Sequence, residues 1–469
     1  MSRIQPGGRL QDGLEALAKR CFADAVSAFG DHLRTHPTDQ SAYAHLGYAR
    51  AAANDEFVGK ITDPGTDGAD LLAFARSISR KLPRPSKRVL RPAPRRPGRL
   101  RIGFLSPDFR QHSCAFFLRS LFERRDRSQF EFHCFADFQV TNFDALSERF
   151  RLSADKWTET TRMTMPELAA CIAEASIDVL VDVGGYSFGS TAPVCAYKPA
   201  RKIVTWLGFP ASTGMPEIAY RFGDAVSDPE GPADAHFSER FVRLDGPFLC
   251  YTPDVATPLP APVPTGDICF GTFNALHKLN IETARLWVRI LDAVPASRLL
   301  LKCNLKEDPA GEAFLRGMFV AAGLAAERLT LLDFTPNLRT HLDTYAQMHV
   351  SLDTMPYNGT TTTCEALWMG VPVVVLRGKR HSACVSASLL HHAGLGELIA
   401  ETPDEYVAKA VALAQDPARL EAYRSMRPRL AQTPLYDAER WVRLFEAGLL
   451  KVFSDRPEPA MGAAQGSER

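Results

Sequence analysis

The sequence lacks paired cysteines, and that absence excludes two common kinds of small structural site. Its ten cysteines are scattered singly, and no C-x-x-C pair occurs. Zinc ribbons and disulfide-stapled secreted domains both need closely spaced cysteines. We therefore predict no zinc site and no disulfide framework, and we expect most of the thiols to be small buried side chains.

Long apolar runs and an excess of charge of one sign are absent as well. No apolar stretch approaches the roughly 18 residues of a membrane-spanning helix, and the N-terminus lacks the apolar core of a signal peptide. The formal net charge is only +1, so the chain as a whole is not attracted to nucleic acid or to an anionic membrane. These absences predict a cytoplasmic protein with no nucleic-acid partner and no membrane partner.

What is present is the composition of an ordinary globular protein, with 45% hydrophobic and 23% charged residues. A chain of 469 residues is too long for a single hydrophobic core, and proline-rich stretches mark where it divides. The predicted units are a tetratricopeptide-like helical segment (1–60), a basic proline-rich linker (61–98), an N-terminal α/β domain (99–251), a second proline-rich linker (252–266), a C-terminal α/β domain (267–433), a terminal helix (434–453) and a disordered tail (454–469).

Residues 10–53 show the spacing of amphipathic helices and are similar to one and a half tetratricopeptide repeats. Such units bury their apolar faces only by stacking, so this all-α segment must pack on the rest of the chain, on another copy or on a client protein. Residues 80–101 then carry ten Lys or Arg, five prolines and no acidic or aromatic residue. Without aromatic side chains to stack on bases, this stretch is typical of a solvated, proline-stiffened linker.

Beyond the linker, apolar strands alternate with amphipathic helices. The expected strands lie at residues 101–106, 130–135, 177–183, 268–273, 299–302, 329–334 and 349–352. Alternation of this kind builds parallel sheets that are covered by helices. The sequence therefore predicts an α/β fold of two doubly wound domains.

The most informative stretch is residues 352–374, which read as a strand end, a tight loop, a helix and the start of another strand. A helix N-terminus has free backbone N–H groups and the positive end of the peptide dipole, so it suits a phosphate. Thr361 and Thr362 add hydroxyl donors there, and Glu365 is placed to accept hydrogen bonds from a ribose diol. An alternative stays open, because Thr362 and Glu365 also have the spacing of a capping box, which would only stabilise the helix.

This stretch resembles the nucleotide-sugar loop of the protein O-GlcNAc transferases and the SPINDLY-like glycosyltransferases. The blocks RIGFLSPDFRQHS (101–113), WLGFPASTG (206–214) and FNALHK (273–278) are similar to blocks of that family in the same order. The resemblance covers roughly residues 99–450. It implies the GT-B fold, in which two Rossmann-like domains form the cleft and a terminal helix crosses back to the first domain.

The resemblance also implies roles for single residues. His112, at the start of a predicted helix, would be the catalytic histidine, and the ordinary pKa of histidine suits proton transfer near neutral pH. Lys278 would neutralise the β-phosphate of the leaving nucleotide diphosphate. Without the family context, these two would be read as surface residues. The substrate-binding residues that the resemblance implies are Asn274, His341, Thr360, Thr361, Thr362 and Glu365, and His341 among them would lie against the nucleobase.

Four departures from the family bear on the donor. Ala275 replaces a family glutamine, and Thr360 replaces a family histidine. Leu338 replaces a lysine three residues before the nucleobase histidine, and Glu365 replaces the ribose aspartate. The residues around the phosphates therefore match the family better than those around the sugar and the base. A UDP-sugar is the favoured donor, but the sequence does not fix it.

These patterns predict an inverting protein O-glycosyltransferase that moves a sugar, in the first place GlcNAc from UDP-GlcNAc, to Ser or Thr hydroxyls of a protein acceptor. No D-x-D signature lies near the phosphate loop, so we expect a nucleotide-sugar donor, no metal and no further cofactor. One alternative is a flagellin-type O-glycosyltransferase that uses a CMP-linked nonulosonic acid or another nucleotide sugar. The other alternative is a catalytically inactive scaffold. Assembly into a homo-oligomer also stays open.

Overall fold

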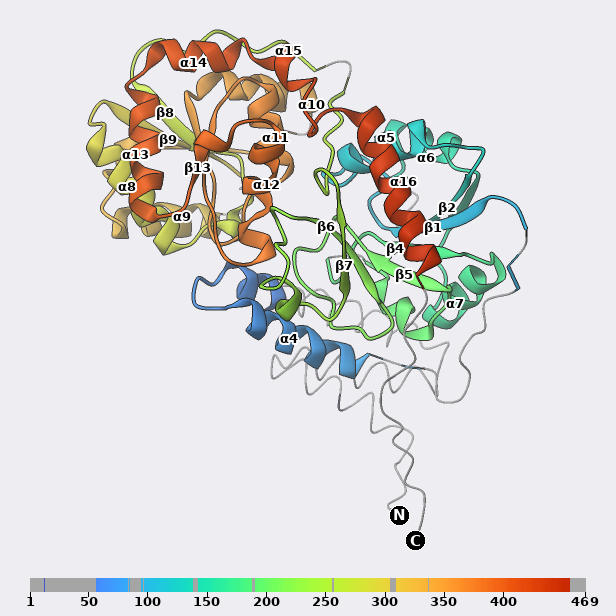
Figure 1. Cartoon of the computed structure of the whole chain (residues 1–469). Coiled ribbons are helices and arrows are strands. Elements are labelled where there is room, and N and C mark those ends of the chain that lie inside the picture. Colours follow the sequence, from blue (N-terminus) through green and yellow to red (C-terminus); the bar gives the residue numbers. More distant parts are fainter. Residues whose placement is uncertain are drawn as a thin grey trace.

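The computed structural model describes residues 12, 56–82, 84, 94–95, 97–137, 142–187, 190–254, 257–303, 309–335 and 337–455 (Figure 1). Apart from residue 12, the predicted tetratricopeptide-like stretch lies outside these residues, as do most of the basic proline-rich stretch and the tail beyond residue 455. In the part that is described, two parallel sheets with helices around them lie side by side (Figure 1). This confirms the predicted fold of two doubly wound α/β domains.

The N-terminal sheet has seven parallel strands in the order β3-β2-β1-β4-β5-β6-β7. The strands are β1 (Leu100–Ser106), β2 (Phe130–Ala136), β3 (Lys156–Glu159), β4 (Val179–Asp182), β5 (Lys202–Thr205), β6 (Tyr220–Asp224) and β7 (Arg240–Leu244), and the helices are α5 (Ala115–Arg124), α6 (Ala145–Ser153) and α7 (Met165–Glu174). The strand order reverses between β1 and β4, where Ile102 pairs with Val179. Ligands of such sheets bind at the carboxyl ends of the strands next to the reversal.

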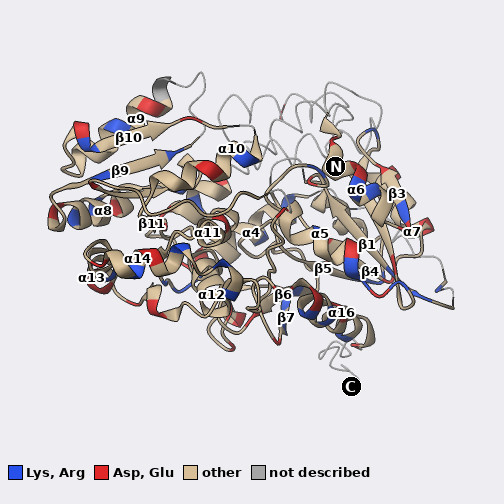
Figure 2. Ribbon diagram, turned by 90° about the horizontal axis from the view of Figure 1, so that it is seen from above, with Lys and Arg blue, Asp and Glu red and all other residues tan. Residues whose placement is uncertain are grey.

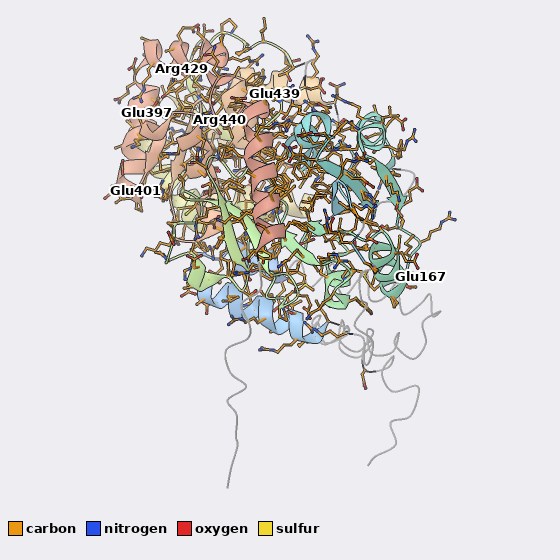
Figure 3. The ribbon with its side chains drawn as sticks, turned by 45° about the vertical axis from the view of Figure 1, so that its right-hand side comes forward. Glu167, Glu397, Glu401, Arg429, Glu439 and Arg440 are labelled. Carbon is orange, nitrogen blue, oxygen red and sulfur yellow. The ribbon has the colours of Figure 1, made fainter. Side chains whose placement is uncertain are left out.

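Local sequence explains these elements. β1 is almost wholly buried, as a strand in the middle of a parallel sheet must be. α5 follows it and buries a run of aromatic and aliphatic side chains against the sheet. α7 begins after Thr164, which forms a capping box with Glu167, labelled in Figure 3.

The C-terminal sheet has six parallel strands in the order β10-β9-β8-β11-β12-β13. The strands are β8 (Ile268–Thr272), β9 (Ser297–Lys302), β10 (Leu329–Leu332), β11 (Val350–Leu352), β12 (Val373–Leu376) and β13 (Ile399–Ala400). The helices are α8 (Ile281–Ala293), α9 (Pro309–Ala321), α10 (Leu338–Asp343), α11 (Thr361–Trp368), α12 (Val385–His392), α13 (Pro403–Ala414), α14 (Pro417–Arg424) and α15 (Arg427–Leu430). Short 3-10 helices occur in both domains. The N-terminal domain contains η2 (Ala192–Tyr197) and η3 (Asp234–His236). The C-terminal domain contains η4 (Leu276–Lys278), η5 (Ala326–Arg328), η6 (Thr344–Gln347), η7 (His381–Ala383) and η8 (Gly396–Leu398). The strand order reverses between β8 and β11.

The last helix, α16 (Ala438–Ser454), leaves the C-terminal domain and packs on α5 and β7 of the N-terminal domain (Figure 1). Trp441 on this helix is buried, stacks on Trp206 with ring centroids 5.7 Å apart, and donates a hydrogen bond of 2.9 Å to the Pro247 carbonyl. Glu439, labelled in Figure 3, forms an ion pair with Arg124 of α5. The helix expected over residues 434–453 therefore joins the two domains into one continuous core.

The predicted linker at residues 61–98 is wrong over its first part. Residues 56–62 are helical, and α4 (Gly68–Lys81) follows them. Ala75 and Ile78 of α4 pack in a cluster with Phe57, Phe209 and other side chains of the N-terminal domain. We overlooked the helix because its apolar residues were outnumbered by basic residues and prolines just beyond it, although they recur at helical spacing.

Two surface features bear on partners. Among the described residues, no helix is both long enough and apolar enough to cross a membrane. Acidic and basic residues both occur along α16 (Figure 2).

Candidate active site

Three loops that follow strand ends meet between the two domains. Residues 107–114 follow β1, residues 273–278 follow β8, and residues 353–360 follow β11 and lead into α11. The first loop touches the start of α11, because the Thr361 hydroxyl lies 3.5 Å from the carbonyl oxygen of Ser113. Since β1 and β11 belong to different sheets, the site lies where the domains meet.

Asp353 is the centre of a buried hydrogen-bond network on the C-terminal side. Asn274 Nδ2 donates to Asp353 Oδ1 and to the Thr354 hydroxyl over 3.0 Å each, and the Gly359 N–H donates to the same carboxylate oxygen over 2.7 Å. The Thr362 hydroxyl donates to the side-chain oxygen of Asn274. Burial raises the pKa of Asp353. The hydrogen bonds that its carboxylate accepts and the nearby positive charge of Lys278 both oppose that rise. We did not predict this residue, although an aspartate directly after a buried strand was a usable signal.

Position 359 requires a glycine, because the loop backbone lies so close to this network that no Cβ atom fits. A Cβ atom at this position would lie 2.7 to 2.8 Å from side-chain oxygens of Thr363, Asn274 and Thr362. The first turn of α11 is therefore held directly against Asn274. Thr360, the residue that precedes α11, makes no side-chain cap, so its side chain does not occupy the N–H groups that a phosphate would use.

Lys278 ends η4 beside this helix N-terminus. Its Nζ donates to the Asn358 carbonyl over 2.7 Å and lies 4.1 Å from the centre of the Tyr357 ring. Removal from water lowers the pKa of Lys278 to about 8, although the Asp353 carboxylate acts in the opposite direction. The lysine is therefore a poorly solvated cation for which a phosphate would be a favourable partner.

His341 and Glu365 form the other end of the C-terminal site. His341 Nε2 lies 3.0 Å from Glu365 Oε2, and His341 Nδ1 lies 2.7 Å from Nζ of Lys302, which ends β9. An ammonium can only donate, so Nδ1 accepts and Nε2 carries the proton that it gives to Glu365. The imidazole, whose centre lies 5.6 Å from that of Phe273, is thereby fixed in one orientation. Sequence reasoning missed Lys302. Its amine lies beside His341, whereas Leu338, which replaces a lysine of the family, has no amine to offer.

The capping-box alternative for Thr362 and Glu365 is not formed. The Thr362 hydroxyl is bonded to Asn274, and Glu365 Oε2 accepts from His341 and, over 3.2 Å, from the Tyr345 hydroxyl. One oxygen of Glu365 is therefore already engaged within the protein. A ribose diol would have to meet the other oxygen, Oε1.

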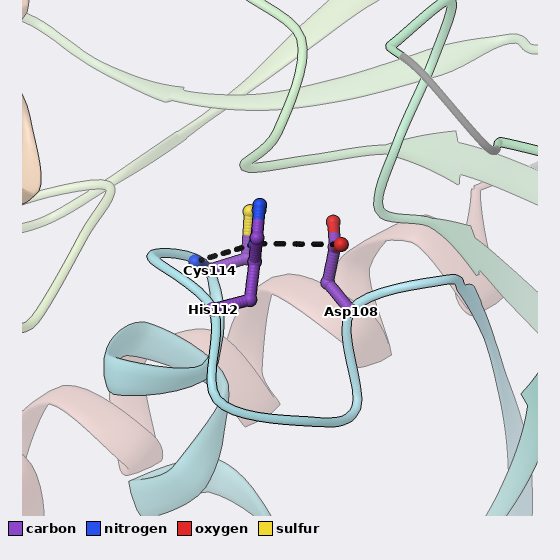
Figure 4. Close-up of side chains that lie close together, drawn as sticks. All are labelled: Asp108, His112 and Cys114. Atoms are coloured by element: carbon purple, nitrogen blue, oxygen red, sulfur yellow. Dashed lines mark hydrogen bonds and ion pairs between the residues drawn. The ribbon is translucent and has the colours of Figure 1, made fainter. Parts of the chain in front are cut away.

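His112 lies on the N-terminal side, in the turn before α5 (Figure 4). Its Nδ1 is 3.4 Å from Asp108 Oδ1 and accepts a hydrogen bond of 3.3 Å from the Cys114 N–H. Its side chain is 37% exposed. Burial lowers the pKa of His112 and outweighs the opposing effect of Asp108, so the ring is mainly neutral at pH 7 and retains a lone pair.

The N-terminal segment that we had taken for a linker borders the site on a third side. Arg380 donates to the carbonyl groups of Ile61 and Thr66 and, over 3.2 Å, to that of Asp63. Tyr357, whose ring faces Lys278, packs against the cluster around Phe57. Residues 56–66 therefore contact both domains next to the phosphate loop.

The structure places the predicted residues in three groups. One group contains Asn274, Lys278, Thr360, Thr361 and Thr362 around the start of α11. The pair of His341 and Glu365 lies beyond it on the same domain. His112 stands apart on the other domain, and it is connected to the first group through the contact between Thr361 and Ser113.

Comparisons with known proteins agree with this arrangement. The model of glycosyl transferase family 41 matches residues 82–252 and 255–444. The protein of Solanum lycopersicum named probable UDP-N-acetylglucosamine–peptide N-acetylglucosaminyltransferase SPINDLY is 37% identical over 363 residues, which are 76% of this chain and 38% of that protein. The protein of that name from Arabidopsis thaliana is 37% identical over 351 residues, which are 73% of this chain and 38% of that protein. The chain thus spans about 38% of the length of these curated relatives.

A solved structure extends the likeness to three dimensions. A mutant of the O-GlcNAc transferase of Thermobaculum terrenum is 30% identical, covers 94% of this chain and 89% of its own, and superposes with a TM-score of 0.80. The fold of two facing α/β domains is therefore the GT-B fold that the sequence resemblance implied.

Proposed function

The chain belongs to glycosyl transferase family 41, and we propose that it is an inverting protein O-glycosyltransferase that moves a sugar from a nucleotide donor to a Ser or Thr hydroxyl. The observation that carries this proposal is that Lys278, bonded to the Asn358 carbonyl, lies beside the Asn274–Asp353 hydrogen-bond network at the start of α11. It gathers a cation, hydroxyl groups and a helix N-terminus around one place. The names of the relatives favour UDP-GlcNAc as the donor.

On the donor side, the C-terminal domain would hold the nucleotide diphosphate. The N–H groups at the start of α11 and the Thr361 hydroxyl would bind the phosphates, and Lys278 would neutralise the charge that develops on the β-phosphate. The Thr362 hydroxyl would bind a phosphate only after releasing Asn274, to which it donates. The His341 ring, fixed by Lys302 and Glu365, would lie against the nucleobase. Lys278, Thr362 and His341 are each held by a hydrogen bond to another protein group before the donor arrives.

On the acceptor side, His112 would act as the general base. The acceptor oxygen forms a bond to the anomeric carbon while the bond from that carbon to the diphosphate oxygen breaks, through an oxocarbenium-like state. The hydroxyl proton passes to the neutral His112 ring, and the electron pair of the broken bond leaves with the diphosphate. A single displacement of this kind inverts the anomeric centre.

We further propose that the reaction needs no metal and takes place in the cytoplasm. Lys278 and the helix dipole supply positive charge where other transferases use a cation. The nine cysteines among the described residues are free thiols, which suits a reducing compartment. The acceptor is proposed to be a protein, in keeping with the peptide acceptors in the names of the relatives.

A thermal-shift panel tests the proposal and identifies the donor. It compares UDP, UDP-GlcNAc, UDP-GalNAc, UDP-glucose, GDP-sugars and CMP on wild type and on Lys278→Ala, because a ligand that binds only the folded state raises Tm by mass action. We expect a rise with UDP and UDP-GlcNAc that Lys278→Ala abolishes.

The other outcomes separate the alternatives. A rise with CMP alone would replace the proposed donor by a CMP-linked nonulosonic acid. A rise confined to GDP-sugars would keep the reaction class but change the donor. No rise with any nucleotide would contradict the enzyme and favour the inactive scaffold.

A further inference from the structure

Three side chains of different chemical classes gather in the loop between β1 and α5. They are the Asp108 carboxylate, the His112 imidazole and the Cys114 thiol (Figure 4). Their ligand atoms all lie within 4.8 Å of one another. Elsewhere in the described residues, no other group of three His, Cys, Asp or Glu side chains lies together in this way.

The spacing within this group fits a metal ion. Asp108 Oδ1 and His112 Nδ1 are 3.4 Å apart. Two ligands that bind one tetrahedral Zn²⁺ at about 2.0 to 2.1 Å are themselves roughly 3.4 Å apart. The separations to the thiol are at most 4.8 Å, which exceeds the spacing of bound ligands by no more than about 1.4 Å, so a small shift of the thiol would complete three ligands on one ion. All three residues belong to one short loop, so this adjustment needs no movement of the domains.

The charges of the group also favour a cation. Asp108 and Cys114 are buried, with 6% and 8% of their surface exposed. A divalent ion would compensate both the carboxylate and the thiolate, and the thiol proton would be released on binding.

We propose that Asp108, His112 and Cys114 bind a divalent ion of the Zn²⁺ and Co²⁺ kind, with a fourth position open to the cleft, and that this ion inhibits the enzyme. Three protein ligands of mixed N, O and S type with an open position are usual for Zn²⁺. An ion on Nδ1 uses the one lone pair of the neutral ring and leaves the proton on Nε2. His112 then has no lone pair left to accept a proton.

Metal binding and inhibition rest on different observations. Metal binding rests only on the three side chains. Inhibition rests on the proposed function, because it requires His112 to be the base. Donor binding involves residues of the other domain, so UDP should bind equally well with and without the ion.

The binding half is tested by titrating the full chain with Co²⁺ after treatment with a chelator. A thiolate bound to Co²⁺ gives a charge-transfer absorption in the near ultraviolet. We expect one saturable equivalent in wild type, no such band in Cys114→Ser, and a band retained in Cys171→Ser, the matched control at a half-exposed cysteine of α7. Absence of the band in wild type, or its persistence in Cys114→Ser, would overturn the site.

The inhibition half is tested by measuring sugar transfer against Zn²⁺ concentration, with each variant compared only with itself. Wild type and Cys171→Ser should lose turnover and regain it with EDTA, whereas Cys114→Ser should need at least about tenfold more Zn²⁺. Equal sensitivity of Cys114→Ser and wild type would contradict the inference. A Co²⁺ band without transfer from any donor would instead refute the proposed function and leave the metal site standing.

Discussion

The C-terminal domain contributes to the candidate site side chains that are already bonded to one another, whereas the N-terminal domain contributes a half-exposed histidine. Asp353, Asn274, Thr362 and the loop backbone form one buried network next to Lys278. His112 has only a weak contact with Asp108 and one backbone donor. Under the proposed function, this difference would make the donor half the more preorganised of the two and leave the acceptor half with a more exposed base.

The donor half should be broken most severely by removing its cation. Lys278→Ala is expected to lower kcat/KM on the order of 10³-fold, because the charge on the leaving diphosphate is then uncompensated. Steady-state transfer assays measure this, and Lys451→Ala, at an exposed lysine of α16, is the matched control. A loss of less than tenfold with unchanged folding would contradict the role of Lys278.

The acceptor half should depend on His112 alone. His112→Ala is expected to lower kcat on the order of 10²-fold, since a general base contributes about that much. Single-turnover kinetics with bound donor isolate the chemical step, and His391→Ala, at an exposed histidine of α12, is the control. If His112→Ala kept full turnover, the base would have to be another group.

A change of pH should act on the donor half in a defined direction. The lowered pKa of Lys278, about 8, means that its charge is present below pH 8 and is lost above it. The affinity for UDP should therefore weaken about tenfold between pH 7 and pH 9. Lys278→Arg retains its charge over this range and should flatten the profile, and a wild-type Kd that stays constant up to pH 9 would refute the assignment.

The smallest effect concerns the network itself. Thr362→Val removes the hydroxyl that donates to Asn274 and should lower the free energy of unfolding by about 1 kcal/mol. Urea denaturation measures this. The control is Thr360→Val, because the Thr360 hydroxyl caps no helix N–H, and it should cost less. Equal losses in the two variants would show that the network adds nothing to stability.

The same comparison explains what the sequence could and could not predict. The strands and α11 follow from apolar runs, breakers and the threonine-rich start, because those signals are local. The partnership of Lys302 with His341 joins residues 39 positions apart, and it exists only because β9 ends beside α10. Helix α4 has a local signal too, in apolar residues at helical spacing that pack with Phe209, but the basic residues and prolines just beyond it outweigh that signal. The catalytic and binding roles of the site residues remain predictions.

The most direct test of this account is a calorimetric titration of UDP into wild type, Lys278→Ala and His112→Ala. Lys278→Ala should lose most of the affinity, whereas His112→Ala should keep the wild-type Kd within about twofold, because the two residues serve separate halves of the proposed site. Equal loss in both variants, or loss only in His112→Ala, would contradict the claim that the C-terminal domain holds a preformed donor site.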